Sequence, residues 1–411
     1  MRRINVAGNS RTRDEVVRRE FRQFESSWYD GRKIKLSRDR VDRLGFFSEV
    51  NVDTNEVPGT ADQVDLTITI KEKPTGNLAL GAGFSSADKL ALTASIKQEN
   101  VFGSGNYLGV ELNTSRSQRT LVLSTVDPYF TIDGISRGID LYYRTSRPIN
   151  NGQSNTEYEL ITPGFAIRFG VPFSEYDTVF FGIGAERTEI KGAQALPNSY
   201  FLYREQFGET SSSVPLTIGW TRDNRDSALV PTAGRYMRVN LDYAPLGDAK
   251  YLRANLQGQQ YIAISRAFTF GVNAEIGYGK GIGGRPYPIF KNFYGGGLGT
   301  VRGFDQGSLG PVDVTGAYIG GNRRFNVNNE LYVPVPGTGN DRTLRLFGYL
   351  DAGNVWGEHD KLTLGSLRAS VGIGLSWVSP VGPLKLSFGV PIRKKPEDRI
   401  QRLQFQIGTA F

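Results

Sequence analysis

Apolar residues alternate with polar residues or glycine along most of the chain, from about Asn77 to the last residue. An alternation of period two predicts β-strands whose two faces meet different surroundings. About sixteen segments carry this pattern, each roughly nine to twelve residues long, which is enough to cross a bilayer when the strand is tilted. Clusters of glycine, proline and aspartate separate the segments, as turns require. The clearest segments are residues 161–173, 237–243, 252–264, 268–278 and 367–377.

Two architectures suit such strands: a soluble sandwich and a membrane barrel. In a sandwich the apolar faces of two sheets pack together, whereas in an outer-membrane barrel they face lipid and the other face lines a wet lumen. The barrel is favoured because aromatic residues gather near segment ends and the polar face carries charge in mid-segment. We therefore predict a 16-stranded antiparallel transmembrane β-barrel over residues 75–411. The mid-segment charges are Arg168, Glu275, Glu330 and Asp351.

Residues 1–74 follow a different pattern, which predicts a small α+β domain with the order strand, helix, helix, strand, strand. Thr12 is followed three residues later by Glu15, which matches a capping box and predicts a helix start there. A second helix is expected from Gly31 to Leu44, because Gly45 stands where a C-cap would be. The strands are expected around residues 4–6, 47–52 and 64–70.

Composition excludes several kinds of chemistry. The 411 residues include no cysteine and one histidine, so disulfides, thiolate zinc sites, iron–sulfur clusters and two-histidine metal sites within one chain are excluded. The formal net charge is +8 without a block of like charges, which argues against nucleic-acid binding. No apolar run is long enough for a transmembrane helix. We predict no catalytic residue, no metal site and no cofactor.

The first and last barrel segments have to meet if the barrel closes. Each is short or rich in glycine, alanine and glutamine, so we expect the ladder that joins them, here called the seam, to be weak. The apolar positions expected there are Leu78, Leu80, Ala82 and Phe84 in the first segment and Leu403, Phe405, Ile407 and Phe411 in the last.

One connection is unusually long and covers about residues 282–318. Loops of this length are usually functional. Its many glycines do not make a phosphate-binding loop, because the Lys-Ser/Thr pair that nucleotide binding uses is missing. The loop contains the run Val301-Arg302-Gly303-Phe304.

Several segments together resemble one known family, and the resemblance covers the whole chain. The run at 301–304 is similar to the VRGF motif in loop six of the BamA family of outer-membrane protein assembly factors and their translocation relatives. Residues 1–74 resemble a polypeptide-transport-associated (POTRA) domain, the one nearest the barrel. Further similarity lies in residues 223–226 with Pro231 and Gly234 (the family's mid-barrel hairpin), residues 349–356 (its thirteenth strand) and the terminal Phe411 (a targeting signal).

The resemblance implies a protein of the bacterial outer membrane in Gram-negative cells, with the POTRA domain in the periplasm. Such a protein binds unfolded outer-membrane β-barrel clients and assists their insertion and folding, with a lateral seam as the implied route. Its partners would be outer-membrane lipid and the accessory periplasmic lipoproteins of the assembly complex, the BAM complex, and not nucleic acid. Members of the BamA type carry five POTRA domains, so we expect that earlier domains and a leader were removed from this chain.

The resemblance also implies that loop six folds into the lumen and that its arginine pairs with acids on the barrel wall. By resemblance that arginine is Arg302, and its partners are Glu330 and Asp351. The alternation supports this separately, because the neighbours of both acids face lipid and turn the two carboxylates inward. Carboxylates on adjacent strands can flank one guanidinium with bidentate geometry. The alternative is that both acids only line a wet lumen.

Two other classes of function stay open. A protein-secretion pore of the two-partner type shares the barrel, the POTRA domain and a similar loop-six motif, but it usually carries a plug helix and two POTRA domains. A passive porin needs no POTRA domain, and a barrel enzyme needs a catalytic group, for which His359 in the loop 357–360 is a poor candidate. Ion conductance and a dedicated exported client would identify the pore.

Overall fold

The chain packs as two compact units. In this computed structural model the described residues are 1–60, 62–147, 158–174, 176–192, 196–265, 267–337, 342–379 and 382–408. The first unit comprises Met1–Ala79, Ser95–Val110 and Leu123–Ile139, and the second comprises Leu80–Ala94, Glu111–Val122 and Asp140–Phe411. Within the described residues, no helix combines the length and the apolar character needed to span a membrane.

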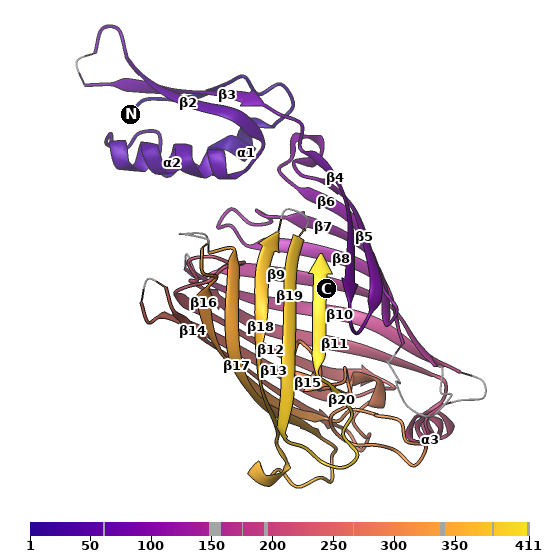
Figure 1. Ribbon diagram of the computed structural model, residues 1–411. Coiled ribbons are helices and arrows are strands. Elements are labelled where there is room, and N and C mark those ends of the chain that lie inside the picture. The colour runs from indigo at the N-terminus through magenta and orange to yellow at the C-terminus, as the bar shows by residue number, and fades with distance from the viewer. Residues whose placement is uncertain are drawn as a thin grey trace. The chain divides into compact units, whose positions relative to one another are not determined.

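The N-terminal module is a three-stranded sheet with two helices on one face, in the predicted chain order (Figure 1). The third strand lies in the centre of the sheet, and its alternate residues Leu66 and Ile68 are fully buried against the helices. Asp30 caps the second helix by accepting a hydrogen bond from the Arg32 amide. Gly45 follows that helix at a φ of +74°, which confirms the predicted helix end. The elements are β1 (Ile4–Ala7), α1 (Asp14–Arg18), α2 (Gly31–Arg43), β2 (Phe47–Glu56) and β3 (Val64–Glu72).

The capping box predicted for Thr12 and Glu15 is wrong. The helix α1 is only five residues long, and its N-cap residue makes no side-chain hydrogen bond. The Thr12 hydroxyl instead accepts a hydrogen bond from Asn100 Nδ2 at 2.8 Å, and the Thr12 amide donates to the Glu72 carboxylate at 2.6 Å. Partners far away in the chain therefore take the groups that a local cap would use, and residue spacing alone does not reveal such partners.

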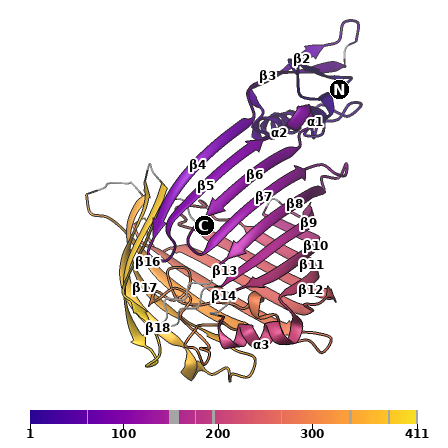
Figure 2. The same ribbon diagram turned by 90° about the vertical axis from the view of Figure 1, so that its right-hand side faces the viewer.

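The predicted 16-stranded antiparallel barrel is confirmed. Its strands follow one another around the wall in chain order, and the last strand closes onto the first (Figures 1 and 2). The wall strands are β4 (Gly76–Ser85), β5 (Lys89–Gln98), β6 (Tyr107–Thr114), β7 (Gln118–Asp127), β8 (Ser136–Ser146), β9 (Glu159–Pro172), β10 (Asp177–Lys191), β11 (Thr210–Asp223), β12 (Gly234–Gly247), β13 (Tyr251–Ala263), β14 (Thr269–Gly281), β16 (Arg323–Pro334), β17 (Leu344–Trp356), β18 (Arg368–Ser379), β19 (Gly382–Arg393) and β21 (Leu403–Gly408).

Short elements lie in the connections between wall strands. Two of them, β15 (Gly303–Phe304) and β20 (Ile400–Gln401), pair with each other and form a separate two-stranded ribbon. The others are α3 (Asn198–Phe207) and the 3₁₀ turns η1 (Val101–Gly103), η2 (Ile289–Lys291) and η3 (Leu364–Ser366). The connection between β14 and β16, residues 282–322, is called loop six from here on, and it contains both η2 and β15.

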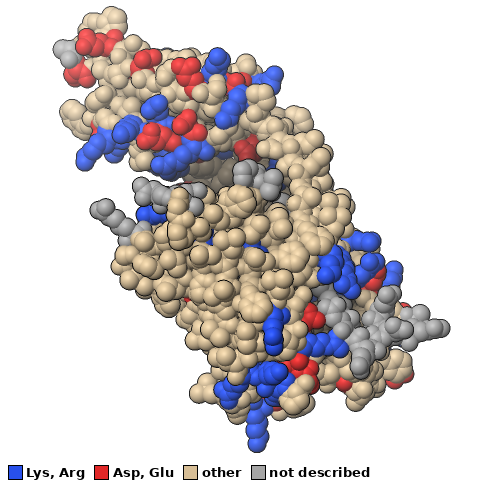
Figure 3. Space-filling model, in the orientation of Figure 1, with Lys and Arg blue, Asp and Glu red and all other residues tan. Residues whose placement is uncertain are grey.

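The outer wall of the barrel is apolar. The paired residues Ile373 and Phe388 on β18 and β19 are 68% and 46% exposed, whereas the inward Ser370 and Ser387 on the same strands are fully buried. On the face drawn in Figure 3, few charged residues lie over the middle of the wall, and Lys, Arg, Asp and Glu gather at its loop end. A wall with so many exposed large apolar side chains fits contact with lipid.

Candidate functional site

Loop six folds back on itself and is buried. Its residues Val301, Phe304 and Leu309 form an apolar cluster that is almost inaccessible to solvent. A bridge between Gly295 and Leu309 closes the fold-back. Gly296 makes the close approach possible, because it has a φ of +100° and a Cβ there would lie 2.4 Å from a backbone oxygen. The loop therefore presents its arginine from a tight, buried turn.

Arg302 forms a bidentate ion pair with Asp351 on β17. Its Nε donates to Asp351 Oδ2 at 2.7 Å and its Nη2 donates to Oδ1 at 2.6 Å. The Arg302 backbone amide donates to Oδ2 as well, at 3.0 Å. The two side chains are 1% and 0% exposed. Three hydrogen bonds to one carboxylate in a buried place fix both the position and the direction of the arginine.

The third guanidinium nitrogen contacts Glu330 on β16. Arg302 Nη1 donates to Glu330 Oε1, and the same oxygen accepts a hydrogen bond from Lys385 Nζ at 3.1 Å. The Tyr332 hydroxyl donates to the other oxygen of Glu330. Two cations therefore face two carboxylates, so that the cluster as a whole is neutral. Neutrality matters here because an unpaired charge in a buried place is costly.

Two aromatic rings lie against the Arg302 guanidinium. The Arg302 guanidinium carbon lies 3.7 Å from the centre of the Tyr349 ring and 5.5 Å from that of Phe347. Cations are attracted to the face of an aromatic ring, most strongly where water is excluded. Tyr349 and Phe347 belong to the same strand as Asp351, so β17 supplies both the carboxylate and the ring face.

Loop six is also attached to the segment that leads into the last strand. The ribbon pairs Gly303 with Gln401 and Phe304 with Ile400. The Gln404 side chain, which is 1% exposed, extends this pairing by one more step. It accepts a hydrogen bond from the Gly303 amide at 3.2 Å and donates to the Phe304 carbonyl at 2.7 Å. The residues next to Arg302 thus hold the start of β21.

A second ion pair holds loop six on another part of the wall. Lys291 of η2 pairs with Glu186 on β10, with side chains that are 19% and 7% exposed. The same carboxylate accepts hydrogen bonds from Ser213 Oγ at 3.0 Å and from the Tyr251 hydroxyl at 3.2 Å. Loop six is therefore anchored both at β10 and at the adjacent strands β16 and β17.

In the described residues, which end at 408, β21 and β4 pair at three positions and β21 and β19 at five, whereas β13 and β14 pair at thirteen. One of the three joins Ile407 to Phe84, and the Phe84 ring stacks on that of Phe405 with centres 5.8 Å apart. The Ser86 amide adds a hydrogen bond to the Phe405 carbonyl at 2.9 Å.

The described part of the ladder reaches Gly83 on β4. Leu78 and Leu80 are 68% and 77% exposed, and among the described residues neither is paired with β21. Gly408 has a φ of +87°, and a Cβ there would lie 2.3 Å from the carbonyl oxygen of Ala82. The last described residue of β21 thus touches β4 closely at one point, and the described ladder ends there.

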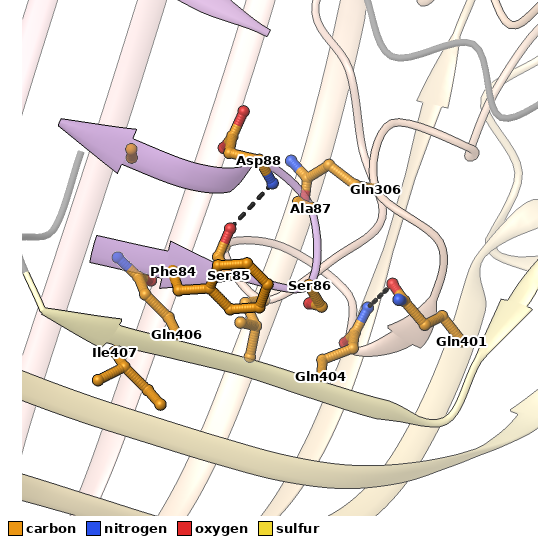
Figure 4. Close-up of a pocket in the computed structure, with 13 residues that line it drawn as sticks. Phe84, Ser85, Ser86, Ala87, Asp88, Gln306, Gln401, Gln404, Gln406 and Ile407 are labelled. Carbon is orange, nitrogen blue, oxygen red and sulfur yellow. Dashed lines mark hydrogen bonds between the residues drawn. The ribbon is translucent and has the colours of Figure 1, made fainter. Parts of the chain in front are cut away.

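A cavity of about 190 Å³ lies beside the seam, between the tip of the β4–β5 hairpin, loop six and β21 (Figure 4). Its lining is about equally polar and apolar. Ser85 and Asp88 come from the hairpin, and Gln404 and Gln406 come from the last strand. On this side the strand and the hairpin tip are joined by backbone hydrogen bonds, with the cavity between their side chains.

The structure brings together Arg302, Glu330 and Asp351, and of the predicted seam residues it brings together Phe84, Phe405 and Ile407. Leu403 pairs with Phe388 of β19 and not with β4. Phe411 lies outside the described residues. Sequence reasoning missed Gln404, Lys385, Tyr349, Lys291 and Glu186. The inward alternation of β10, β17, β19 and β21 could have marked the wall residues, but their partners in loop six were not readable.

Comparisons with known proteins agree on one family. Residues 100–411 match the model described as the Omp85 superfamily domain, and residues 1–73 match the POTRA model, described as surface antigen variable number repeat. Outer membrane protein assembly factor BamA of Neisseria meningitidis serogroup B is 40% identical over 99% of this chain and 56% of that protein. Sorting and assembly machinery component 50 homolog A of Xenopus laevis is 26% identical over 100% of this chain and 90% of that protein.

Solved structures show the same fold. The crystal structure of BamA from Haemophilus ducreyi lacking POTRA domains 1–3 matches with a TM-score of 0.90 and 29% identity, over 100% of this chain and 84% of that one. CdiB from Acinetobacter baumannii matches with a TM-score of 0.61 at 13% identity, a likeness of fold alone. This chain spans about half the length of the BamA proteins that it matches. From the extent of the Omp85 match and the POTRA module before it, the chain belongs to the Omp85 superfamily.

Proposed function

We propose that this chain assists the insertion and folding of β-barrel proteins into the outer membrane. The observation that carries the proposal is the seam between β4 and β21, where the described residues pair at three positions. At a net stabilisation of about 1 kcal/mol per hydrogen bond, these three positions add little to barrel closure. Opening the seam exposes two strand edges inside a membrane, where a backbone group without a partner is costly.

An incoming strand satisfies those exposed edges. Unpaired N–H and C=O groups on β4 can pair with an extended client segment by β-augmentation, which needs no cofactor and no covalent step. Lipid-facing residues such as Leu78 and Leu80 flank that edge, so the client strand would meet lipid as soon as it pairs. The role of the chain in this proposal is that of a template and not that of an enzyme.

Loop six keeps the rest of the barrel rigid while the seam opens. In this proposal Arg302, with Glu330 and Asp351, has a structural and conformational role. The VRGF run supplies the arginine and the ribbon partners of the last strand. These contacts confine the opening to the strand pair with the weakest pairing in the barrel wall.

The proposed partners follow from the proposed role in barrel insertion. The barrel meets outer-membrane lipid, the clients are unfolded outer-membrane β-barrel proteins, and the POTRA module lies in the periplasm, where accessory lipoproteins of the BAM complex bind it. Relatives named as outer membrane protein assembly factors support the choice of clients. The Xenopus laevis sorting and assembly machinery component 50 homologue matches this chain, with its one POTRA module and one barrel, over 90% of its own length.

The proposal is tested by a folding assay in liposomes. Ser85→Cys with Gln406→Cys places a reducible disulfide across the seam, at residues that pair and that line the cavity. The chain has no cysteine of its own, so no other disulfide forms. Asn240→Cys with Asn255→Cys, at paired residues of β12 and β13, is the matched control. A urea-unfolded client barrel is added, and its folding is followed as a band shift on a cold gel.

The chain should speed client folding over empty liposomes. The seam disulfide should abolish that gain until reductant is added, and the control disulfide should leave it unchanged. Equal acceleration by the oxidised and the reduced seam variant would exclude opening as the mechanism. Ion conductance without any acceleration would favour the secretion-pore alternative.

A further inference from the structure

We infer that Gln404 is a positioning residue that couples the Arg302 cluster in loop six to the pairing of the last strand at the seam. The inference deepens the proposed function, because it names the contact through which the state of loop six reaches the seam. It concerns the free chain and requires no client.

The attachment of loop six to the start of β21 is continuous. The backbone of Arg399 accepts a hydrogen bond from the Asp305 amide at 2.9 Å, and the ribbon pairs Gln401 with Gly303. Gln404 then binds both the Gly303 amide and the Phe304 carbonyl. A glutamine amide that binds one backbone donor and one backbone acceptor imitates a further step of strand pairing.

The same two residues of loop six follow directly after the anchored arginine. The Arg302 backbone amide is bound to Asp351, and the next amide in the chain is bound to Gln404. A movement of the arginine out of its site therefore displaces the groups that Gln404 holds. Because buried polar groups do not give up partners without cost, the two contacts are formed or broken together.

On its other side the last strand contacts β4 and the tip of the β4–β5 hairpin. Figure 4 shows the cavity between Gln404 and Gln406 on β21 and the hairpin residues Ser85 and Asp88. In the described residues, the contacts across it are the three paired positions, the stacked rings of Phe84 and Phe405, and two hydrogen bonds between Ser86 and the Phe405 backbone. The position of β21 at the seam is thus set by β19 and β4 through strand pairing and by loop six through Gln404.

A coupling of this kind has a reciprocal consequence. If Gln404 links the two places, a change at Arg302 has to alter seam opening, although Arg302 contacts β16 and β17 and not the seam strands. The size of that effect has to depend on whether Gln404 is present. If each residue has an independent structural role, the effects of the two substitutions on the rate of seam opening multiply in the double variant.

Hydrogen–deuterium exchange of the intact chain in liposomes measures seam opening. The reporter is the peptide around residues 83–87, whose Ser86 amide is bound across the seam, because its exchange rate rises with the fraction of open seam. The variants are Gln404→Leu, Arg302→Lys and the double variant. Gln406→Leu is the matched control, since Gln406 lines the same cavity and, in the described part of the chain, makes no side-chain hydrogen bond to loop six. A cold gel checks folding.

Gln404→Leu should speed exchange at the seam about tenfold, the factor expected when one to two net hydrogen bonds are lost. Gln406→Leu should leave the rate at the wild-type value. Arg302→Lys keeps the charge but loses the bidentate contact, so it should also speed exchange, and the double variant should be no faster than the faster single variant.

The inference is overturned if Gln404→Leu exchanges like Gln406→Leu, or if the two changes multiply. Should Gln404→Leu fail to fold, Gln404→Glu replaces it, because it keeps the acceptor for the Gly303 amide and loses the donor to Phe304. About threefold faster exchange is then expected, and an unchanged rate overturns the inference. Since no client is present, failure here leaves the folding assay of the proposed function intact.

Discussion

Removing the positive charge of Arg302 should destabilise the barrel strongly, because it leaves a buried carboxylate without its cation. In Arg302→Met the side chain keeps much of its volume and loses every polar contact. Asp351 is 0% exposed, and of the three hydrogen bonds that its carboxylate accepts from Arg302 the variant loses the two from the side chain and keeps the one from the backbone amide. Glu330 is less affected, since Lys385 and Tyr332 still bind it.

The expected cost is about 3–5 kcal/mol, the usual range when one partner of a buried ion pair is removed. Two comparisons isolate the cause. Asp351→Asn added to Arg302→Met removes the orphaned charge and should recover about half of the loss or more. Arg324→Met breaks a pair with Glu275 whose side chains are 22% and 18% exposed, so it should cost about 1 kcal/mol or less.

Urea unfolding in liposomes measures these differences through the fluorescence of the four tryptophans and through the cold-gel band shift. A loss below about 1 kcal/mol in Arg302→Met would refute the reasoning, because a pair that matters so little is not a buried ion pair in the membrane-bound protein. A double variant that is no more stable than Arg302→Met would show that the orphaned charge is not the cause.

Three further predictions follow from single contacts. Lys291→Met removes the cation that pairs with Glu186, so loop six loses its attachment to β10. Trypsin should then cut loop six in the folded barrel at least several times faster than in the wild type. Tyr349→Leu removes the ring that the Arg302 guanidinium contacts and should lower the free energy of unfolding in urea by about 1–2 kcal/mol. Added to Arg302→Met, the same change should cost less than that, because the cation is already gone. Burial opposes ionisation of Glu72, but hydrogen bonds from Thr12 and its neighbours outweigh it and lower the Glu72 pKa to about 2. The pKa of Glu72 in the folded module thus lies below the ordinary value of 4.5. The contribution of Glu72 to the free energy of unfolding is therefore complete above pH 4.5 and is lost as the pH falls toward 2. We expect the stability of the module in thermal unfolding to fall between pH 6 and 3, and the fall to be smaller by about 1–2 kcal/mol in Glu72→Gln, where Asp30 and Asp65 with their lowered pKa values still contribute.

The barrel could be predicted from the sequence because its physical cause is local. A lipid-facing wall needs an apolar residue at every second position, and this alternation is visible in the sequence of each strand. The alternation also places Glu330 and Asp351 on the inner face. The seam was predicted as weak from its composition, and the structure adds that the described ladder is limited to Gly83, Phe84 and Ser85.

The partners of loop six could not be predicted in the same way. A loop of irregular backbone has no period, so nothing in its sequence states that Lys291 meets Glu186 or that Gly303 meets Gln404. These contacts depend on how the loop folds back between glycines. The Thr12 capping box failed for a related reason: its hydroxyl has a partner, Asn100, that is distant in the chain.

The central claim is that a client strand pairs with the edge of β4 that faces the seam, and site-specific crosslinking tests this claim most directly. A single Ala82→Cys serves as the probe, and Val371→Cys on the lipid face of β18 serves as the control. Single cysteines are scanned along the terminal strand of a client during folding in liposomes. The account predicts disulfides from Ala82→Cys to alternate client residues, because side chains of one strand face point the same way at every second residue, and none from Val371→Cys. Accelerated folding with no crosslink to Ala82→Cys, or with equal crosslinking to both probes, would contradict it.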